Sequence, residues 1–471
     1  MYLDINRNST IPIKKQLYDA LTFQILQGEI EQGKKLPSSR QLAEELNIAR
    51  NTVVEIYEQL IAEAYLVTRR GSGTFVSNIS QFHLKEANEK KREAKPVKPK
   101  TNTISLVAGT PDLTQFPQKA WQNAYRDVAY KDQAALHGYG NPFGYRPLRE
   151  TLAKYLLVHK GIRCDYRQII ITGGTKDALR LIALSLNDEY QQLMIESPSI
   201  TFAVGIFKSS GYGILPVPVD QEGLVVDALS VDASPCLIYT SPSHQFPLGG
   251  TLSITRRRAL IEYAREHGHL IIEDDYDSEF RYRGAPVNAL SQLSGEDVIH
   301  VGTFSKTISP SLRLGYMVVP EKVLEQVRAY QFTAGNPPPT LNQAVVNEMI
   351  ANGSYEKHLY RMNKLYKAKM AVIVDSLTEA FGATDITING ENSGLHISVE
   401  FNNLTFTSAH QQTFIAHGIT VNRCSEYRVG GKNEPCQTLV LGFGHLQLDA
   451  IPKAITRLKS AIEAIQIEQG E

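Results

Sequence analysis

A run of charged residues and prolines divides this chain into two parts that must fold separately. Residues 81–103 lose hydrophobic periodicity and read Lys-Glu-Ala-Asn-Glu-Lys-Lys-Arg-Glu-Ala-Lys, then Pro-Val-Lys-Pro-Lys. Such a composition cannot bury enough apolar surface to form a core. We expect a linker at residues 80–103, between a first domain at 1–79 and a second at 104–471. The lysine excess of the linker could also contact a phosphate backbone.

Composition excludes several classes of protein. Lysine plus arginine and aspartate plus glutamate number 49 each, so any nucleic-acid contact must be local. The four cysteines lack metal-binding spacing, which predicts no metal site and favours a reducing compartment. The chain has neither a signal-peptide pattern nor a run of about 20 apolar residues. We therefore expect a soluble, cytoplasmic protein without a membrane partner.

The first domain has the pattern of a helix-turn-helix followed by a hairpin. Apolar residues recur at helical spacing over residues 12–27, and a short helix is predicted over residues 37–47. A further helix begins near residue 50, after a gap of only three or four residues. Residues 65–76 indicate two strands around an Arg-Gly-Ser-Gly turn.

The start of the third predicted helix is suited to reading DNA bases. In a helix-turn-helix, the second helix presents its first residues to the major groove. Arg50 can bind guanine, Asn51 can bind adenine, and the Thr52 hydroxyl can hold a phosphate. A protein-interaction module with ordinary surface arginines is the alternative for these residues.

Three motifs carry a family resemblance in the first domain. Leu-Pro-Ser-Ser-Arg-Gln-Leu-Ala, Ala-Arg-Asn-Thr-Val and Arg-Arg-Gly-Ser-Gly-Thr-Phe-Val fall within residues 10–77, which resemble the winged helix-turn-helix of GntR-type transcription regulators. The resemblance implies an operator-binding dimer. The DNA contacts that it implies are Ser38, Arg40, Arg50, Asn51, Thr52, Arg69 and Gly73.

The second domain alternates short apolar runs with helical stretches. The runs lie near residues 168–172, 192–196, 236–240, 270–273 and 298–302. This alternation predicts a large α/β domain with a mainly parallel sheet. From about residue 330, long helices mix with strands, which indicates a smaller α+β subdomain.

One lysine is placed for chemistry with an aldehyde. Lys306 follows an apolar strand, stands among hydroxyls and has Arg313 seven residues after it. An amine attacks an aldehyde only when it is unprotonated, so burial or nearby positive charge must lower its pKa. A structural ion pair is the alternative for a lone buried lysine.

Two further motifs suit the same chemistry. Ile-Ile-Thr-Gly-Gly-Thr-Lys-Asp-Ala-Leu at residues 170–179 predicts a strand, a turn and a helix start that direct free amides at an anion. Asp274 and Tyr276 are two residues apart, so they point the same way on a strand. A carboxylate can keep a pyridine nitrogen protonated, and a phenol can hydrogen-bond the ring's 3-oxygen. A structural turn and a solvated acidic loop are the alternatives.

Taken in order, these motifs resemble the fold-type I pyridoxal 5'-phosphate enzymes of the aspartate aminotransferase superfamily. The resemblance implies that Lys306 is the Schiff-base lysine, with Asp274 at the pyridine nitrogen and Tyr276 at the 3-oxygen. His244 stands where aminotransferases have an asparagine, and residues 139–149 look like their segment that reaches the neighbouring subunit's site. The residues implied to hold the phosphate are Gly174, Thr175, Thr303, Ser305 and Arg313.

The two domains together resemble the MocR subfamily of GntR regulators. The motifs Tyr-Thr-Ser-Pro-Ser-His-Gln-Phe-Pro and Glu-Asp-Asp-Tyr-Asp-Ser-Glu-Phe-Arg-Tyr are typical of it. The resemblance implies a head-to-tail homodimer that binds operator DNA and senses pyridoxal phosphate, or an amine that reacts with it. Control of vitamin B6 synthesis is the leading expectation, and amino acid metabolism or transport is the next.

Two departures from the aminotransferase pattern favour a sensor over an enzyme. Ile200 stands where an aromatic ring usually stacks on the cofactor, although Phe202 could substitute. Val440 falls near the usual carboxylate-binding arginine, which leaves Arg423 as a tentative effector contact. We therefore expect no efficient transamination and favour pyridoxal phosphate as the effector. An active aminotransferase with an appended DNA-binding module, and a scaffold without cofactor, are the alternatives.

Overall fold

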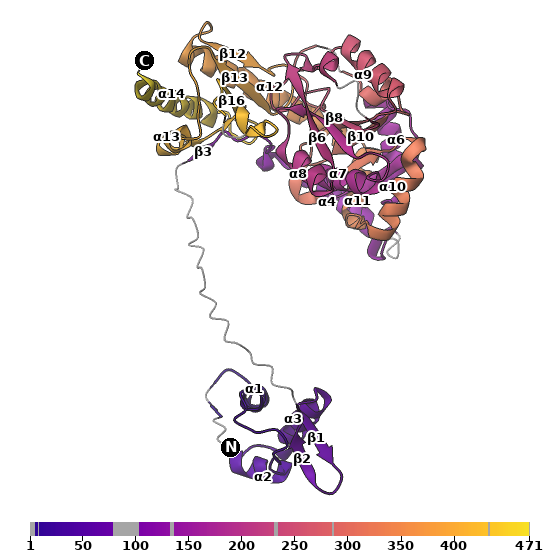
Figure 1. The fold of residues 1–471 in the computed structure, drawn as a ribbon, viewed down its shortest axis with the longest axis vertical. Coiled ribbons are helices and arrows are strands. Elements are labelled where there is room, and N and C mark those ends of the chain that lie inside the picture. Colours follow the sequence, from indigo (N-terminus) through magenta and orange to yellow (C-terminus); the bar gives the residue numbers. More distant parts are fainter. Residues whose placement is uncertain are drawn as a thin grey trace. The chain divides into compact units, whose positions relative to one another are not determined.

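The computed structural model of the protein describes residues 5–7, 9–78, 103–131, 136–229, 234–284, 287–431 and 434–470. The chain divides into two compact units, residues 1–98 and 99–471 (Figure 1). Residues 80–102 of the predicted linker lie outside the described residues. Within the described ranges, no helix is both long enough and apolar enough to cross a membrane.

Residues 9–78 form three helices and an antiparallel hairpin, which confirms the winged helix-turn-helix. Helix α2 begins where Ser38 Oγ accepts the backbone N–H of Gln41 at 3.2 Å, and it ends at Asn47 in the left-handed region. Residues 47–49 alone separate it from the next helix. The elements are α1 (Ile13–Leu26), α2 (Ser39–Leu46), α3 (Arg50–Ala62), β1 (Leu66–Arg69) and β2 (Gly73–Val76). The core contains fully buried Leu17, Leu21, Val53, Ile56 and Leu60.

The second unit is built on a sheet in which eight described strands pair. Five of these strands, β10, β9, β8, β5 and β6, run parallel, whereas β11 is antiparallel to both of its neighbours. All five predicted apolar runs are strands of this sheet. In sheet order the strands are β4 (Ile169–Thr172), β11 (Gly315–Val318), β10 (Val298–Thr303), β9 (Leu270–Asp275), β8 (Leu237–Thr240), β5 (Gln192–Ser197), β6 (Gly213–Asp220) and β7 (Gly223–Leu224).

Helices cover both faces of this sheet, which explains why its strands are continuously apolar. Ile170 packs with residues of α7, α8 and α10, whereas Ile171 faces the other side and packs with α4, α6 and α11. Helix α9 also packs on this second side. The helices are α4 (Gln118–Ala129), α6 (Arg146–Lys160), α7 (Thr175–Ser185), α8 (Thr201–Ser209), α9 (Ile254–Glu266), α10 (Glu321–Ala334) and α11 (Thr340–Ala351).

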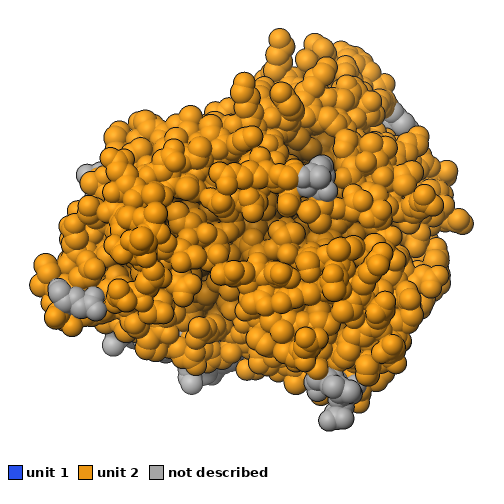
Figure 2. Space-filling view, turned by 90° about the horizontal axis from the view of Figure 1, so that it is seen from above, with its two compact units in different colours: residues 1–98 blue, residues 99–471 orange. Residues whose placement is uncertain are grey.

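Residues 99–471 form one continuous body (Figure 2), and a smaller α+β subdomain follows α11 within it. Its antiparallel sheet has the order β12-β13-β16-β15. The boundary expected near residue 330 falls within α10, and α11 still packs with the large domain. The elements of the subdomain are α12 (Ser354–Phe381), β12 (Ile386–Asn389), β13 (His396–Phe401), α13 (His410–Ala416), β14 (Ile419–Thr420), β15 (Asn422–Arg423), β16 (Thr438–Gly442) and α14 (Ala450–Gln469).

The first described residues of the second unit join this small subdomain. Strand β3 (Ile104–Ser105) pairs in parallel with β14, and Leu106 N–H donates to the Thr420 carbonyl at 2.7 Å. The Leu106 carbonyl accepts the Gly442 N–H at 2.7 Å. A Cβ on Gly442 would lie 2.5 Å from Ala108 Cα, so only glycine permits this close backbone approach.

We predict that Gly442→Ala lowers the free energy of unfolding by about 1–3 kcal/mol, because the added methyl group forces residues 107–108 off the small sheet. Urea unfolding would measure this change. Gly205→Ala is the matched control, since a Cβ there meets nothing within 4 Å. Equal stability of the two variants would contradict the prediction.

Candidate functional site

A cavity of about 450 Å³ opens in the second unit, where strands β8, β9 and β10 reach their carboxyl ends. Ligands bind at this edge in open parallel sheets. All of the predicted cofactor residues line the cavity except His244. Ile200 and Phe202, the two candidates for stacking on a ligand ring, also line it.

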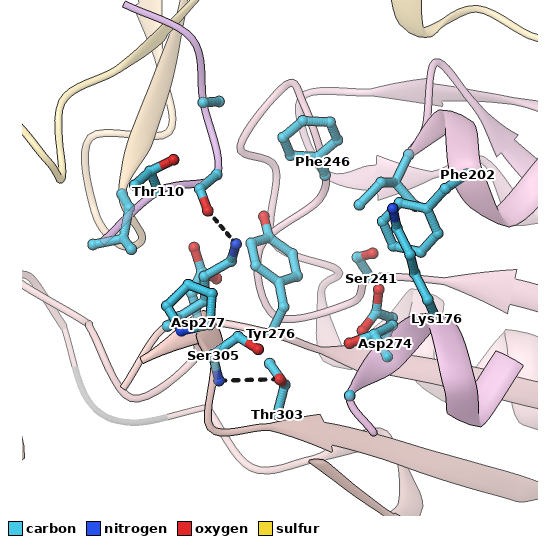
Figure 3. A pocket seen from close by; sticks show the side chains of 18 of the residues that line it. Thr110, Lys176, Phe202, Ser241, Phe246, Asp274, Tyr276, Asp277, Thr303 and Ser305 are labelled. Atoms are coloured by element: carbon cyan, nitrogen blue, oxygen red, sulfur yellow. Dashed lines mark hydrogen bonds between the residues drawn. The ribbon is translucent and has the colours of Figure 1, made fainter. Parts of the chain in front are cut away.

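One end of the cavity is built to hold an anion. Helix α7 starts after Gly174, whose φ of 100° favours glycine. Because the first amides of a helix have no acceptor within the helix, those of α7 can bind an anionic ligand. Ser305 N–H donates to Thr303 Oγ1 at 3.1 Å (Figure 3), and Arg313 lines the same cavity. A Cβ on Gly315 would lie 2.9 Å from Gly174 Cα, so two glycines bring strand β11 against this turn. Amides, hydroxyls and a guanidinium together suit a phosphate group.

Asp274 presents a buried carboxylate to the cavity. Tyr239 Oη donates to its Oδ2 at 2.5 Å, whereas Oδ1 is buried without a hydrogen-bond partner. Burial raises the pKa of Asp274 to about 7, against the opposing hydrogen bond from Tyr239. A protonated ring nitrogen would supply the missing donor and would stabilise the charged carboxylate.

Lys306 has the character of a reactive amine. Its Nζ donates to the backbone carbonyl of Gly109, and Lys306 has no ion-pair partner within the described parts of the chain. Burial lowers the pKa of Lys306 below its usual value, although the charges of Asp277 and Asp274 oppose this. A lowered pKa raises the fraction of free amine near neutral pH. Among the described residues, Lys306 thus does not form the structural ion pair that was the alternative for it.

Tyr276 and a buried histidine form the wall beside Lys306. Tyr276 Oη donates to the His244 backbone carbonyl at 2.9 Å, and His244 Nδ1 lies 3.0 Å from Asp277 Oδ2. His244 is 1% exposed and so lies behind the cavity wall. Ligand-type atoms of His244, Asp277 and His396 lie within 4.8 Å of one another. The pairing of His244 with Asp277 accounts for Nδ1 without a metal ion.

Arg423 does not line the cavity. On strand β15 it pairs with Leu439, a core residue of the small subdomain, whereas its neighbour Asn422 pairs with Val440. Successive strand residues point to opposite faces, so Arg423 and Val440 face opposite ways. The buried Arg423 side chain contacts Ser425 and Glu426, each at 3.5 Å. We therefore do not propose it as an effector contact.

Several residues of the site were not predicted. Tyr239 stands in an apolar strand and resembles a core residue, and Gly109 acts through its carbonyl alone. Lys176 directly follows Thr175, and its Nζ lies 5.0 Å from the centre of the Phe202 ring (Figure 3). Its place one residue beyond the anion-binding turn was a usable signal. The other unpredicted lining residues include Thr110, Ser241, Phe246, Leu395, His396 and Tyr427.

A second buried carboxylate lies near the site. Glu196, at the end of β5, accepts hydrogen bonds from Thr240 Oγ1 at 2.6 Å, Ser241 N–H at 3.2 Å and Gln245 Nε2 at 3.2 Å. Its donors are all neutral, and the side chain is fully buried. Burial raises the pKa of Glu196 to about 7, against these hydrogen bonds.

In the first unit, the predicted DNA contacts lie on the surface. Arg50 and Asn51 are exposed at the first turn of α3, and Thr52 beside them is half-buried. Ser38 and Arg40 are exposed at the start of α2, and Arg40 pairs with Glu44 at 3.1 Å. The wing residues Arg69 and Gly73 are also exposed. The first turns of α2 and α3 and the hairpin turn therefore carry the predicted contacts.

Comparison with known proteins assigns a class to each unit. Residues 13–76 match the model of the gntR family of bacterial regulatory proteins, and residues 101–437 match that of aminotransferases of class I and II. The structure of Pyrococcus horikoshii kynurenine aminotransferase in complex with PMP matches 78% of this chain and 92% of that chain, with a TM-score of 0.71 and 26% identity. The protein is thus a GntR-type DNA-binding module joined to an aminotransferase fold.

Relatives with both domains narrow this assignment. The chain is 32% identical to the probable rhizopine catabolism regulatory protein MocR of Rhizobium meliloti, over 98% of this chain and 96% of that protein. It is 30% identical to the pyridoxine biosynthesis transcriptional regulator PdxR of Corynebacterium glutamicum, over 97% and 98%. The chain belongs to the MocR subfamily of GntR-type transcription regulators.

We predict that Glu196→Gln becomes more stable relative to wild type as pH rises. The folded pKa of about 7 exceeds the ordinary value of 4.5, so wild-type Glu196 stabilises the fold below pH 4.5 and loses this contribution as pH rises through 7. The gain of the variant between pH 5 and 8 should reach roughly 2 kcal/mol. Urea unfolding at both pH values tests it, and a pH-independent difference would sink the prediction.

Proposed function

We propose that this protein is a transcription regulator whose second unit binds pyridoxal 5'-phosphate and senses it. One observation carries the proposal: a lysine with a lowered pKa, a partnerless carboxylate oxygen and an anion-binding turn line one cavity. The same chain has a GntR-type module with exposed arginine and asparagine at the start of α3. The chain thus contains both a cavity suited to a ligand and a module suited to binding DNA.

Different cavity residues would bind different groups of the cofactor. Bound pyridoxal phosphate supplies an aldehyde carbon that an amine can attack. Lys306 would be the amine, Asp274 would hold the proton of the ring nitrogen, and Tyr276 would hydrogen-bond the ring's 3-oxygen. Phe202 and Ile200 would contact the ring, with Phe202 as the aromatic contact. The phosphate would be bound by Gly174, Thr175, Thr303, Ser305 and Arg313.

The cavity favours a sensor over an aminotransferase. By the resemblance to aminotransferases, Val440 falls near the position of their carboxylate-binding arginine, and Arg423 faces the opposite way from Val440. An amino acid would therefore be held weakly at its carboxylate. This supports pyridoxal phosphate itself as the effector, and the resemblance to PdxR of C. glutamicum supports control of vitamin B6 synthesis. Steady turnover of an amino acid with a keto acid would instead favour the enzyme.

A homodimer is part of the proposal, since paired modules read paired half-sites on DNA. Large apolar side chains exposed on the second unit support a subunit contact. Among them are Tyr125, Tyr130, Tyr139 and Phe332. Tyr139, in the segment expected to reach a neighbouring site, is fully exposed. Such a regulator acts in the cytoplasm, where operator DNA lies.

The test is binding to DNA from upstream of the protein's own gene, with and without pyridoxal phosphate. We expect the cofactor to change the affinity or footprint of wild type and of Lys364→Ala, an exposed lysine on α12. Lys306→Ala should bind DNA without responding to the cofactor. A response that persists in Lys306→Ala, or is missing from wild type, contradicts the proposal.

We predict that Arg50→Ala weakens binding to the specific operator by about 1–3 kcal/mol, because one base contact in the major groove is lost. Binding to unrelated DNA should change less. Lys15→Ala, which breaks only an exposed pair with Asp19, is the control. Fluorescence anisotropy at fixed salt measures both, and equal losses for specific and unrelated DNA would argue against base reading by Arg50.

A further inference from the structure

Residues 106–112, here called the arm, connect the start of the second unit to its reactive lysine. The arm directly follows strand β3, which is the first described strand after the predicted linker. Ala108, Gly109 and Thr110 of the arm line the cavity. Only a few residues of the chain therefore separate the predicted linker from the part of the arm that lies at the cavity of Lys306.

The first part of the arm is fixed to the small subdomain. Leu106 exchanges backbone hydrogen bonds with Thr420 and Gly442, each at 2.7 Å. The side chain of His445 lies 2.8 Å, at Nε2, from the carbonyl of Ser105 just before the arm. Backbone contacts of this kind hold the arm in place whatever side chains it carries.

The last residue of the arm is also held by the small subdomain. Lys369 Nζ, on α12, donates to Asp112 Oδ2 at 2.7 Å and to the Gly444 carbonyl at 2.8 Å. The side chains of both Lys369 and Asp112 are 1% exposed. Asp112 N–H donates to Tyr366 Oη at 3.0 Å. Breaking a buried, hydrogen-bonded ion pair would leave an uncompensated charge, so this pair holds Asp112 firmly in place.

Between these two ends, the arm meets Lys306. The Gly109 carbonyl accepts a hydrogen bond from Lys306 Nζ, shown as a dashed line in Figure 3. Gly109 has a φ of 106°, a conformation that favours glycine, and this turn directs its carbonyl at the lysine. A hydrogen bond from an ammonium group is stronger than one between neutral groups.

We propose that the arm reports the chemical state of Lys306 to the linker. The inference rests on the proposed binding of pyridoxal phosphate. When the free amine bonds to the aldehyde carbon, the aldehyde oxygen leaves as water and takes both amine hydrogens. Nζ would then carry no hydrogen for the Gly109 carbonyl, and a proton that it regained would be shared with the ring's 3-oxygen instead. The centre of the arm is released, next to the segment that leads to the DNA-binding unit.

Hydrogen exchange of the full-length protein, followed by mass spectrometry, tests this release. Without cofactor, amides at the centre of the arm, residues 107–111, should exchange about tenfold faster in Lys306→Ala than in wild type. Pyridoxal phosphate should raise the wild-type rate toward that of the variant and leave the variant unchanged. Lys364→Ala should match wild type throughout.

A second variant separates the hydrogen bond from the loss of a side chain. Lys306→Arg keeps a cationic donor for Gly109 but cannot bond to the aldehyde. The arm in this variant should exchange as slowly as in cofactor-free wild type, with or without pyridoxal phosphate. Exchange as fast as in Lys306→Ala would overturn the inference.

Failure of cofactor binding and failure of the arm to respond give different results. If reduction with borohydride traps cofactor on Lys306 while exchange of the arm is unchanged or slower, the inference is wrong and the proposed function stands. If no cofactor is trapped on Lys306, the proposed function fails. The comparison of cofactor-free wild type with Lys306→Ala still decides whether Lys306 holds the arm.

Discussion

The register between strands β9, β10 and β11 is the constraint on which the site depends. Strands β9 and β10 run parallel with Asp274 opposite Val301, so Asp274 lies beside the strand that leads to Lys306. Strand β11 returns antiparallel and places Gly315 opposite Thr172, at the start of the anion-binding turn. A slip of one residue would turn every side chain to the other face. Groups more than a hundred residues apart in the chain thus meet in one cavity.

Local pattern predicted much of the fold and the lysine-centred half of the site. The helix-turn-helix, the wing and the five apolar strands depend on periodicity and turn residues, which the sequence displays directly. Tyr239 escaped prediction because a tyrosine in a buried strand looks like core until its partner Asp274 is known. Arg423 was misplaced because its strand has two residues, too few to show which face each occupies. Gly109 acts through a backbone carbonyl, which no residue type reveals.

The site combines groups that oppose stability with a scaffold that tolerates them. Asp274 and Glu196 are both buried with a pKa near 7, and Lys306 is half-buried without an ion pair in the described chain. Buried ionisable groups of this kind are expected where a protein binds or reacts with a ligand. The ion pair of Lys369 with Asp112 and the glycine contacts of β16 fix the arm beside them. The arm therefore brings the reactive lysine within a few residues of the connection to the linker.

Chemical trapping would show whether pyridoxal phosphate bonds to Lys306. Wild type and Lys306→Ala would be mixed with pyridoxal phosphate, reduced with borohydride, digested and analysed by peptide mass. We expect one dominant modified peptide in wild type, which contains Lys306, and no equivalent in the variant. Absence of that adduct in wild type, or equal modification of many surface lysines in both proteins, would contradict it.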